Sequence, residues 1–265
     1  MHRINKVIRV AGMKRNGNHG IVNWIISQHR GNATYRNAVR RYESLGYLKS
    51  DSIEAFRDTE GLRKVDLDSA CDKEIFLFTY EDHSVEEALN PEIPMRYHEW
   101  INHDITRSIS IVILRDPFNF FASRIHSELN GRFSIDGWGD CFSQGHTFRL
   151  LGKWKSYARK YLEYEANKFS DEIPVSYNHW VTSRNYRENL CEKLGVKLNH
   201  DKARETVPQW GAGSSFDGDE WQNPDSYLNR WKNYEGHPTL ATMKEDEELM
   251  KLSSSIFGDI FHTGV

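Results

Sequence analysis

Two separated segments of this 265-residue chain carry residue types that could bind phosphate. The first, residues 10–20 (VAGMKRNGNHG), places glycines, two cations and a histidine between an apolar run and an amphipathic stretch. The second, residues 111–117 (IVILRDP), ends an apolar run with Arg115, and Ser123 follows eight positions later. One such segment suggests a nucleotide, whereas two suggest a nucleotide that carries phosphates at both ends.

The first segment predicts a strand, a glycine turn and the start of a helix. Residues 6–11 are short and rich in β-branched side chains, and apolar residues recur at helical spacing after Asn18. The first N–H groups of a helix lack intrahelical partners, and the helix dipole favours an anion there. Lys14 and Arg15 would add positive charge. The alternative is an ordinary turn with two exposed cations.

The spacing of Gly12 and Gly17 invites comparison with the P-loop of nucleoside triphosphatases. That loop continues with a Lys for the β- and γ-phosphates and a Ser or Thr for magnesium. Asn18 and His19 stand at those two positions. The chain therefore lacks the two side chains that a triphosphate–magnesium site needs at these positions, and phosphate would be bound in another manner.

The second segment predicts a strand over 110–114 and a helix over 117–129. Asp116 is a favourable N-cap, and Pro117 suits the first helical position. Arg115 then lies at the carboxyl end of the strand, with Ser123 about two turns into the helix. A guanidinium and a hydroxyl that meet there could hold a phosphate monoester. The alternative is a salt bridge for Arg115 and no role for Ser123.

The order of these motifs resembles the sulfotransferases that use 3′-phosphoadenosine 5′-phosphosulfate. In that family a Lys/Arg-x-Gly-x-x loop holds the 5′-phosphosulfate, and an Arg with a Ser eight residues later holds the 3′-phosphate. The resemblance implies that Arg115 and Ser123 bind the 3′-phosphate. The 5′ side would be bound by Lys14, Arg15, Asn16, Gly17, Asn18 and His19, and the nucleoside would lie near Tyr177, Ser214, Ser215 and Phe216.

The chain also departs from the cytosolic branch of that family. Gly20 replaces the aromatic residue after the first loop, and Arg15 replaces the usual Lys. The Arg-Lys-Gly ahead of the late Trp231-Lys232-Asn233 is missing, so Arg230 would supply a substitute cation. The resemblance is therefore to a divergent member, nearer the bacterial or carbohydrate-modifying branches.

An acceptor hydroxyl must lose its proton during sulfuryl transfer, so a general base is required. Residues 75–80 predict a strand, and Ser84 with Glu87 forms a capping box that starts a helix. The turn between them carries Glu81, the favoured base, and His83, the second choice. His19 is the third, and solvated turn residues are the alternative. Arg15 would stabilise the charge that builds on the departing phosphate.

Strands alternate with helices along the chain, which predicts a single α/β domain over residues 1–265. We expect a three-layer α/β/α architecture with a mostly parallel sheet, which the resemblance identifies as P-loop NTPase-like. Residues 31–72 and 130–145 are polar and irregular, and are predicted to form loop-rich insertions. The expected elements are strands near 6–11, 75–80, 109–114 and 173–177, and helices near 18–29, 84–90, 117–129, 146–168, 184–195 and 240–257.

Composition narrows the class of protein. A net charge of −3 disfavours a nucleic-acid partner, and no apolar run has the length of a transmembrane helix. The three cysteines are far apart, which suggests reduced thiols and a cytoplasmic location. The histidines and cysteines show no metal-ligand spacing, and the implied reaction needs no metal.

The sequence thus favours a sulfotransferase with 3′-phosphoadenosine 5′-phosphosulfate as co-substrate and a carbohydrate or small-molecule acceptor. A small-molecule kinase with a degenerate P-loop and a non-catalytic nucleotide-binding module are the alternatives. The acceptor and the oligomeric state stay open.

Overall fold

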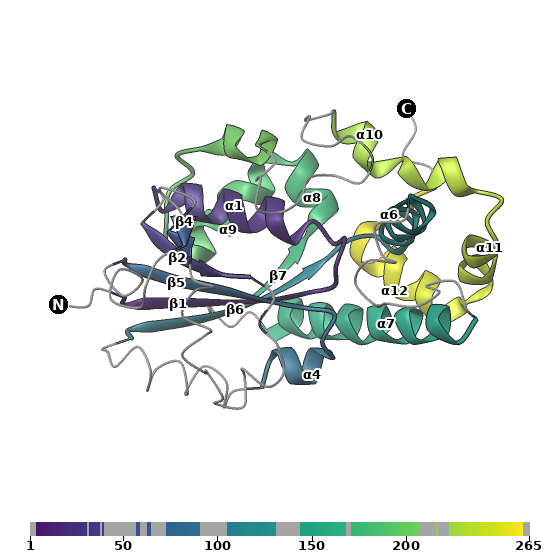
Figure 1. Ribbon diagram of the computed structural model, residues 1–265, viewed down its shortest axis with the longest axis horizontal. Helices are drawn as coiled ribbons and strands as arrows, with labels where there is room; N and C mark the ends of the chain where they lie inside the picture. The colour runs from purple at the N-terminus through teal and green to yellow at the C-terminus, as the bar shows by residue number, and fades with distance from the viewer. Residues whose placement is uncertain are drawn as a thin grey trace.

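The protein is an α/β domain built on one mostly parallel sheet. The computed structural model describes residues 4–30, 32–37, 39, 57–58, 63–64, 73–90, 105–130, 144–167, 171–206, 216 and 223–261. Within these residues a seven-stranded sheet has the order β4-β3-β2-β5-β1-β6-β7 (Figure 1). Its strands are β1 (Lys6–Gly12), β2 (Ala33–Arg36), β3 (Arg57–Asp58), β4 (Arg63–Lys64), β5 (Ile75–Glu81), β6 (Arg107–Leu114) and β7 (Glu172–Ser176).

The five strands from β2 to β7 in this order are parallel to one another, and β3 and β4 add an antiparallel edge. Strand β1 pairs with β5 on one side and β6 on the other, with Val10 opposite Thr79 and Ile111. The chain leaves β1 toward the β2 side and later crosses to the β6 side. The carboxyl end of β1 is therefore a topological switch point, where open α/β sheets form ligand sites.

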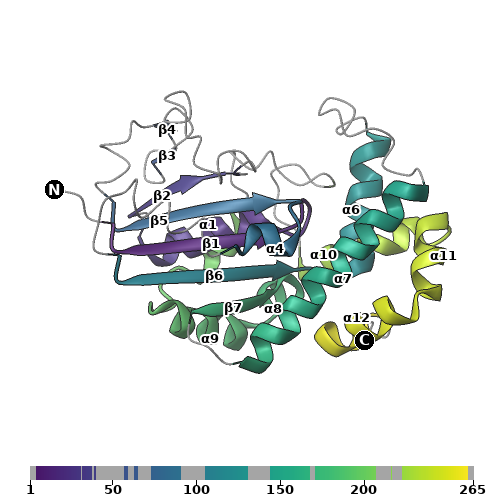
Figure 2. The same cartoon turned by 90° about the horizontal axis from the view of Figure 1, so that it is seen from below.

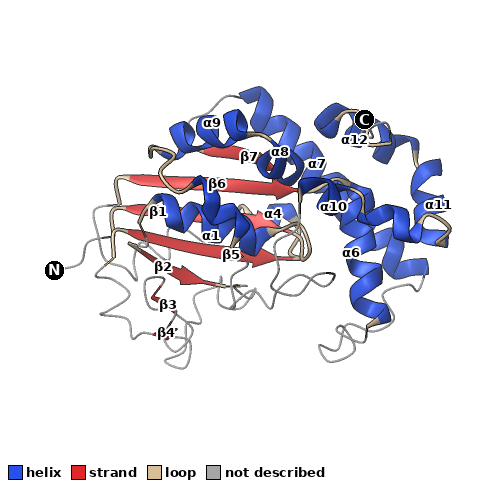
Figure 3. Ribbon diagram, turned by 90° about the horizontal axis from the view of Figure 1, so that it is seen from above, coloured by secondary structure: helices blue, strands red, loops and turns tan. Residues whose placement is uncertain are grey.

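Helices cover both faces of the sheet, which gives the predicted three layers (Figure 3). Along β1, Ile8 and Val10 pack toward α1, α8 and α9, while Val7 and Ala11 pack toward α4, α6, α7 and α12. Burial on both faces explains the continuous apolar runs of these strands. The helices are α1 (Asn18–Gln28), α4 (Val85–Ala88), α6 (Pro117–Leu129), α7 (Gln144–Asn167), α8 (Tyr177–Thr182), α9 (Arg184–Leu194), α10 (Pro224–Leu228), α11 (Pro238–Glu245) and α12 (Glu247–Phe257), with 3₁₀ turns η3 (Asp201–Glu205) and η5 (Arg230–Tyr234).

Helix starts follow the local signals in the sequence. The Asp116 carboxylate accepts the backbone N–H of Asn119 at 2.8 Å, with Pro117 as the first helical residue. Ser84 and Glu87 form the predicted capping box at the start of α4. Each cap satisfies a backbone donor that the helix itself leaves without a partner.

Three expectations about the elements need correction. Residues 33–36, expected to be irregular, form β2 beside β5. The single helix expected over 240–257 is two helices, because the Asp246 side chain accepts the N–H of Leu249 and starts α12 anew. Tyr177 begins α8 and does not end a strand, because the Ser176 side chain caps that helix. Residues 131–143 lie outside the described part.

His29, the C-cap of α1, makes the stability of this fold depend on pH. Burial, and secondarily the nearby Lys6, lowers the pKa of His29 to about 3, and its Nε2 is buried without a hydrogen-bond partner. Below the ordinary histidine pKa of about 6.5, the unfolded chain binds a proton that the folded protein does not bind. This contribution to stability is complete above that pH and is lost as the pH falls toward 3.

We therefore expect the step from pH 7 to pH 5 to cost about 2 kcal/mol of unfolding free energy through His29. Urea unfolding at both pH values measures it. His29→Gln should remove this part of the pH dependence, while Arg30→Gln at the adjacent position should keep it. An identical pH dependence in wild type and His29→Gln would contradict the assignment.

Candidate functional site

The candidate site lies where parallel strands end together. Figure 2 shows β5, β1 and β6 running in the same direction, with their carboxyl ends on the side of α6. Gly12, Glu81 and Arg115 stand at or directly after these three ends, and Tyr177 follows the end of β7. Residues far apart in the sequence are thereby brought to one edge of the sheet.

The loop between β1 and α1 has the backbone of an anion-binding nest. Arg15 has φ +78° and Gly17 has φ +86°, whereas Lys14 and Asn16 do not have positive φ. Such alternation turns successive N–H groups toward one point, as in phosphate-binding loops. Gly17 is also the N-cap of α1, and no side chain caps that helix end. Its first N–H groups are therefore oriented toward the same concavity as the loop.

Two predicted binding residues use their side chains to brace this loop. Asn16 is fully buried and its Nδ2 donates to the Ile113 carbonyl at 3.0 Å, which fixes the loop to β6. Asn18 Nδ2 donates to the Met13 carbonyl at 3.2 Å and to Glu81 Oε1 at 3.3 Å. The Asn16 backbone N–H also donates to the Met13 carbonyl at 3.1 Å, so of these two residues only Asn18 could offer a phosphate its backbone N–H.

Position 17 requires a glycine for two reasons: its left-handed backbone angle and the close approach of the Tyr177 ring. A Cβ atom at Gly17 would lie 2.2 Å from Tyr177 Cδ2, so the tyrosine ring rests directly on the loop. The Arg115 guanidinium lies over the same ring, 4.7 Å from its centroid. The structure thus brings together the predicted residues Gly17, Tyr177 and Arg115.

Arg124 and Asp82, which were not among the predicted site residues, clamp the loop from the other side. Arg124 Nη2 donates to Asp82 Oδ1 at 2.5 Å and to the Lys14 carbonyl at 3.1 Å. The Lys14 N–H donates to the same Asp82 oxygen at 3.1 Å. Lys153 Nζ of α7 donates to the Asp82 carbonyl. The signal in the sequence that could have indicated this pair is Arg124 itself, a charged residue within the apolar stripe of α6, directly after Ser123.

Arg115 is a buried cation, and none of the carboxylates that the structure describes pairs with it. It is 3% exposed, and its two Nη atoms donate to the Tyr227 carbonyl at 2.8 Å and the Arg15 carbonyl at 3.4 Å. Its Nε is buried without a partner. The adjacent Asp116 carboxylate instead accepts from Asn119 and from Asn178. Buried charges are normally paired, so an uncompensated guanidinium at a strand end indicates an anionic ligand.

Two further predicted residues, Arg230 and Phe216, lie near Tyr227, the residue whose carbonyl accepts from Arg115. Arg230 is 7% exposed, and its guanidinium lies 4.4 Å from the Tyr227 ring centroid and 4.6 Å from that of Phe216. Phe216 in turn stacks on the His126 ring of α6 at 4.0 Å. Arg115 and Arg230 therefore both contact Tyr227. Ser123 is buried on α6, one turn before His126. Ser214 and Ser215 lie outside the described residues.

Two of the three candidate bases come together. His19 Nε2 lies 3.6 Å from Glu81 Oε1 and 3.1 Å from Asn37 Oδ1. The Glu81 side chain is 8% exposed, and Oε1 also accepts from Asn18. Among the described residues nothing donates to Glu81 Oε2. A nearly buried carboxylate with one engaged and one available oxygen, beside an anion loop, is suited to accept a proton.

His83, the other candidate base, lies apart from this pair. Its ring packs edge-on against Tyr80 at 5.4 Å, and its Nδ1 is 3.9 Å from Glu87 Oε2. Burial lowers the pKa of His83, so the imidazole is neutral near pH 7. The structure therefore favours Glu81 over His83 as the group nearest the loop.

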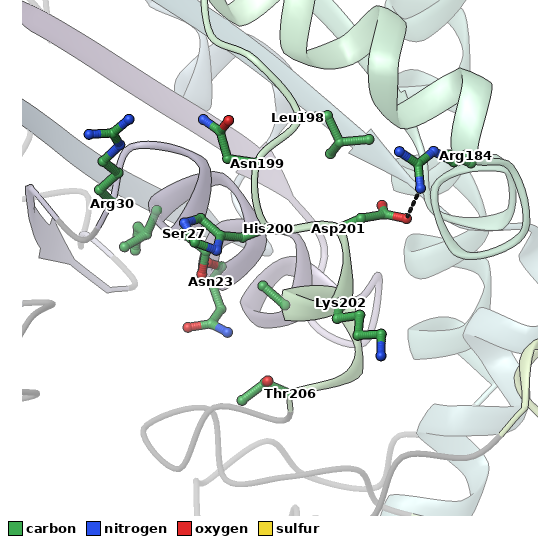
Figure 4. Close-up of a pocket in the computed structure, with 12 residues that line it drawn as sticks. Asn23, Ser27, Arg30, Arg184, Leu198, Asn199, His200, Asp201, Lys202 and Thr206 are labelled. Carbon is green, nitrogen blue, oxygen red and sulfur yellow. Dashed lines mark hydrogen bonds and ion pairs between the residues drawn. The ribbon is translucent and has the colours of Figure 1, made fainter.

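A large groove lies on another part of the molecule and takes no part in this site. It has a volume of about 920 Å³ and is formed by the later turns of α1 and by the segment 198–206 (Figure 4). Its acidic residue, Asp201, is held by the buried Arg187 at 2.5 Å and faces Arg184 at 4.0 Å. The predicted residues do not line it.

Neither a cluster of metal ligands nor a membrane-spanning helix is found among the described residues. No group of three or more His, Cys, Asp or Glu side chains in that part of the chain could hold a metal ion. Of the helices that the structure describes, none has the length and apolar character needed to cross a bilayer.

Comparison with solved structures finds a likeness to mouse sulfotransferase SULT7A1 complexed with PAP. The TM-score is 0.48 at 14% sequence identity, over 94% of this chain and 84% of that chain. No protein-family model matches the sequence, and no curated protein matches it. A likeness of this size assigns neither a family nor an activity.

The anion loop can be tested through its glycines. Gly17→Ala places a side chain at a left-handed backbone position and against the Tyr177 ring, so the nest should distort. We expect the affinity for a phosphate-bearing nucleotide to fall by about tenfold or more. Gly20→Ala is the matched control, because the added Cβ would meet Trp180 at an ordinary 3.7 Å. Equal affinities of the two variants in calorimetric titration would contradict a phosphate-binding loop.

Proposed function

We propose that this protein is a sulfotransferase that uses 3′-phosphoadenosine 5′-phosphosulfate as sulfuryl donor. The observation that carries the proposal is that two buried arginines contact Tyr227, Arg115 through the Tyr227 carbonyl and Arg230 over the Tyr227 ring, while Arg115 also lies over Tyr177, which rests on the candidate anion loop. The loop supplies one phosphate site, and the arginines supply a second. A nucleotide that carries phosphate on both its 5′ and 3′ sides suits this arrangement.

The residues present fit such a nucleotide. Backbone N–H groups at positions 15 and 17–19, with Lys14 and Arg15, would hold the 5′-phosphosulfate. Arg115, Arg230 and Ser123 would hold the 3′-phosphate, with the guanidinium groups already oriented by Tyr177, Tyr227 and Phe216. Phe216 and Tyr177 would border the nucleoside. When bound, the donor supplies an activated sulfuryl group at the loop.

Glu81 is the proposed general base. The acceptor oxygen forms a bond to sulfur, the bond from sulfur to the phosphate oxygen breaks, and the bisphosphate leaves with that electron pair. The acceptor hydroxyl gives its proton to Glu81, whose Oε2 is available while Oε1 is held by Asn18. Arg15 and the loop N–H groups stabilise the negative charge on the departing phosphate. A carbohydrate or small-molecule hydroxyl is the proposed acceptor.

Calorimetric titration tests the donor class. We expect 3′-phosphoadenosine 5′-phosphate to bind, and adenosine 5′-phosphate and ATP–magnesium to bind far more weakly. Arg115→Gln should weaken bisphosphate binding by about tenfold to a hundredfold, because it removes charged hydrogen bonds to the 3′-phosphate. Ser123→Ala keeps the positive charge of Arg115, so its affinity for the bisphosphate should fall less than that of Arg115→Gln. Thermal unfolding of each variant checks the fold. Preferential binding of ATP–magnesium would favour a kinase instead.

The base is tested by comparing Glu81→Gln with His83→Gln. Glu81→Gln should lower the rate of radiolabelled sulfuryl transfer to a panel of hydroxyl acceptors by about 10² to 10⁴. Its affinity for the bisphosphate should stay within about twofold, because Glu81 is proposed to act on the acceptor hydroxyl and not on the nucleotide. His83→Gln should retain most of the activity. Loss of activity in His83→Gln alone would reverse the assignment, and absence of transfer in wild type would favour a non-catalytic binding module.

A further inference from the structure

Asn37 lies at the centre of a polar cluster that joins β2, β5 and α1 behind the proposed base. Its Oδ1 is 2.7 Å from Tyr35 Oη, 3.1 Å from Thr79 Oγ1 and 3.1 Å from His19 Nε2. Tyr35 and Thr79 are 1% and 0% exposed, so water does not replace these contacts. We propose that Asn37 is a positioning residue that keeps His19 protonated at Nε2, so that His19 acts as a hydrogen-bond donor beside Glu81 and not as the base.

The two hydroxyl groups show which atom of the Asn37 amide faces His19. A separation of 2.7 Å between Tyr35 and Asn37 is the usual length of an O–H···O bond and is short for a bond from an amide nitrogen. Tyr35 therefore donates to Oδ1, and Thr79 donates to the same oxygen from the opposite strand. The atom that faces His19 is thus an acceptor.

An acceptor at 3.1 Å fixes the tautomer of His19. Only a protonated Nε2 makes a favourable contact with Asn37 Oδ1, because two lone pairs at this distance would repel. Glu81 Oε1, 3.6 Å from the same nitrogen, is a second acceptor and reinforces the choice. Nε2 therefore carries its proton whether the imidazole is neutral or cationic, and it cannot take a proton from an acceptor hydroxyl.

The consequence for the proposed reaction is a division of roles. Asn18 Nδ2 donates to Glu81 Oε1, while His19 Nε2 donates to Asn37 and faces the same carboxylate oxygen from 3.6 Å. Oε2 is then the oxygen presented to the acceptor. This role of Asn37 rests on the proposed function, whereas the protonation of His19 Nε2 does not.

The protonation state can be measured without nucleotide or acceptor. In the full-length ¹⁵N-labelled protein, the imidazole ¹H–¹⁵N spectrum should contain an Nε2–H correlation of His19, assigned by its loss in His19→Gln. Asn37→Leu removes the acceptor and should speed exchange of this proton with water by about tenfold or more. Asn37→Asp keeps an oxygen in place and should preserve the protected proton. Thermal unfolding confirms that the variants fold.

Two results would overturn the proposal: a wild-type His19 protonated at Nδ1 with Nε2 as acceptor, or an exchange rate in Asn37→Leu equal to that of wild type.

The positioning role of Asn37 is tested by kinetics. Asn37→Leu should lower kcat for sulfuryl transfer by about tenfold to a hundredfold, with bisphosphate affinity within about twofold, and Asn37→Asp should recover part of the loss. Equal losses of kcat and affinity would contradict positioning. A protected Nε2 proton in a protein that transfers no sulfuryl group would overturn the proposed function and leave the tautomer assignment standing.

Discussion

The buried ion pair of Arg124 and Asp82 is the interaction on which the geometry of the candidate site depends. Its two residues bond both the N–H and the carbonyl of Lys14, so they set the orientation of the peptide groups that begin the loop. Burial of two charges costs desolvation energy that their attraction only partly offsets, so such a pair contributes more to geometry than to stability. Loss of one partner would leave a buried charge uncompensated. The loop, the end of β5 and helices α6 and α7 are thereby held in one arrangement.

Arg115 shows the complementary principle, because its charge is buried and no carboxylate in the described part of the chain pairs with it. Carbonyl oxygens and the Tyr177 ring hold the guanidinium in place without neutralising it. Arg230 is held similarly, between the rings of Tyr227 and Phe216. Aromatic faces attract and orient a cation. The carboxyl ends of the strands therefore bring together the loop after β1, the Arg115 guanidinium and the Glu81 carboxylate.

Much of the fold follows from patterns within short stretches of sequence. The apolar runs predicted β1, β5 and β6, and Asp116-Pro117 placed the start of α6 correctly. Strand β2 was missed because four residues, one of them Arg36, carry no clear periodicity, and pairing with β5 decides their conformation. The break at Asp246 was missed because its side chain can favour either a helix interior or a new N-cap, and the packing of α11 and α12 decides between them.

The sequence by itself determined which segments could bind phosphate and which residue types could act as the base. Glycine spacing, capping residues and strand-length apolar runs are local features. They can be recognised without knowing which residues contact one another in the folded protein. The tertiary structure decided that Glu81 joins His19 while His83 packs against Tyr80, and that Asn37, Asp82 and Arg124 complete the site. These contacts join residues far apart in the chain. They depend on strand order and side-chain rotamers, which no local pattern specifies.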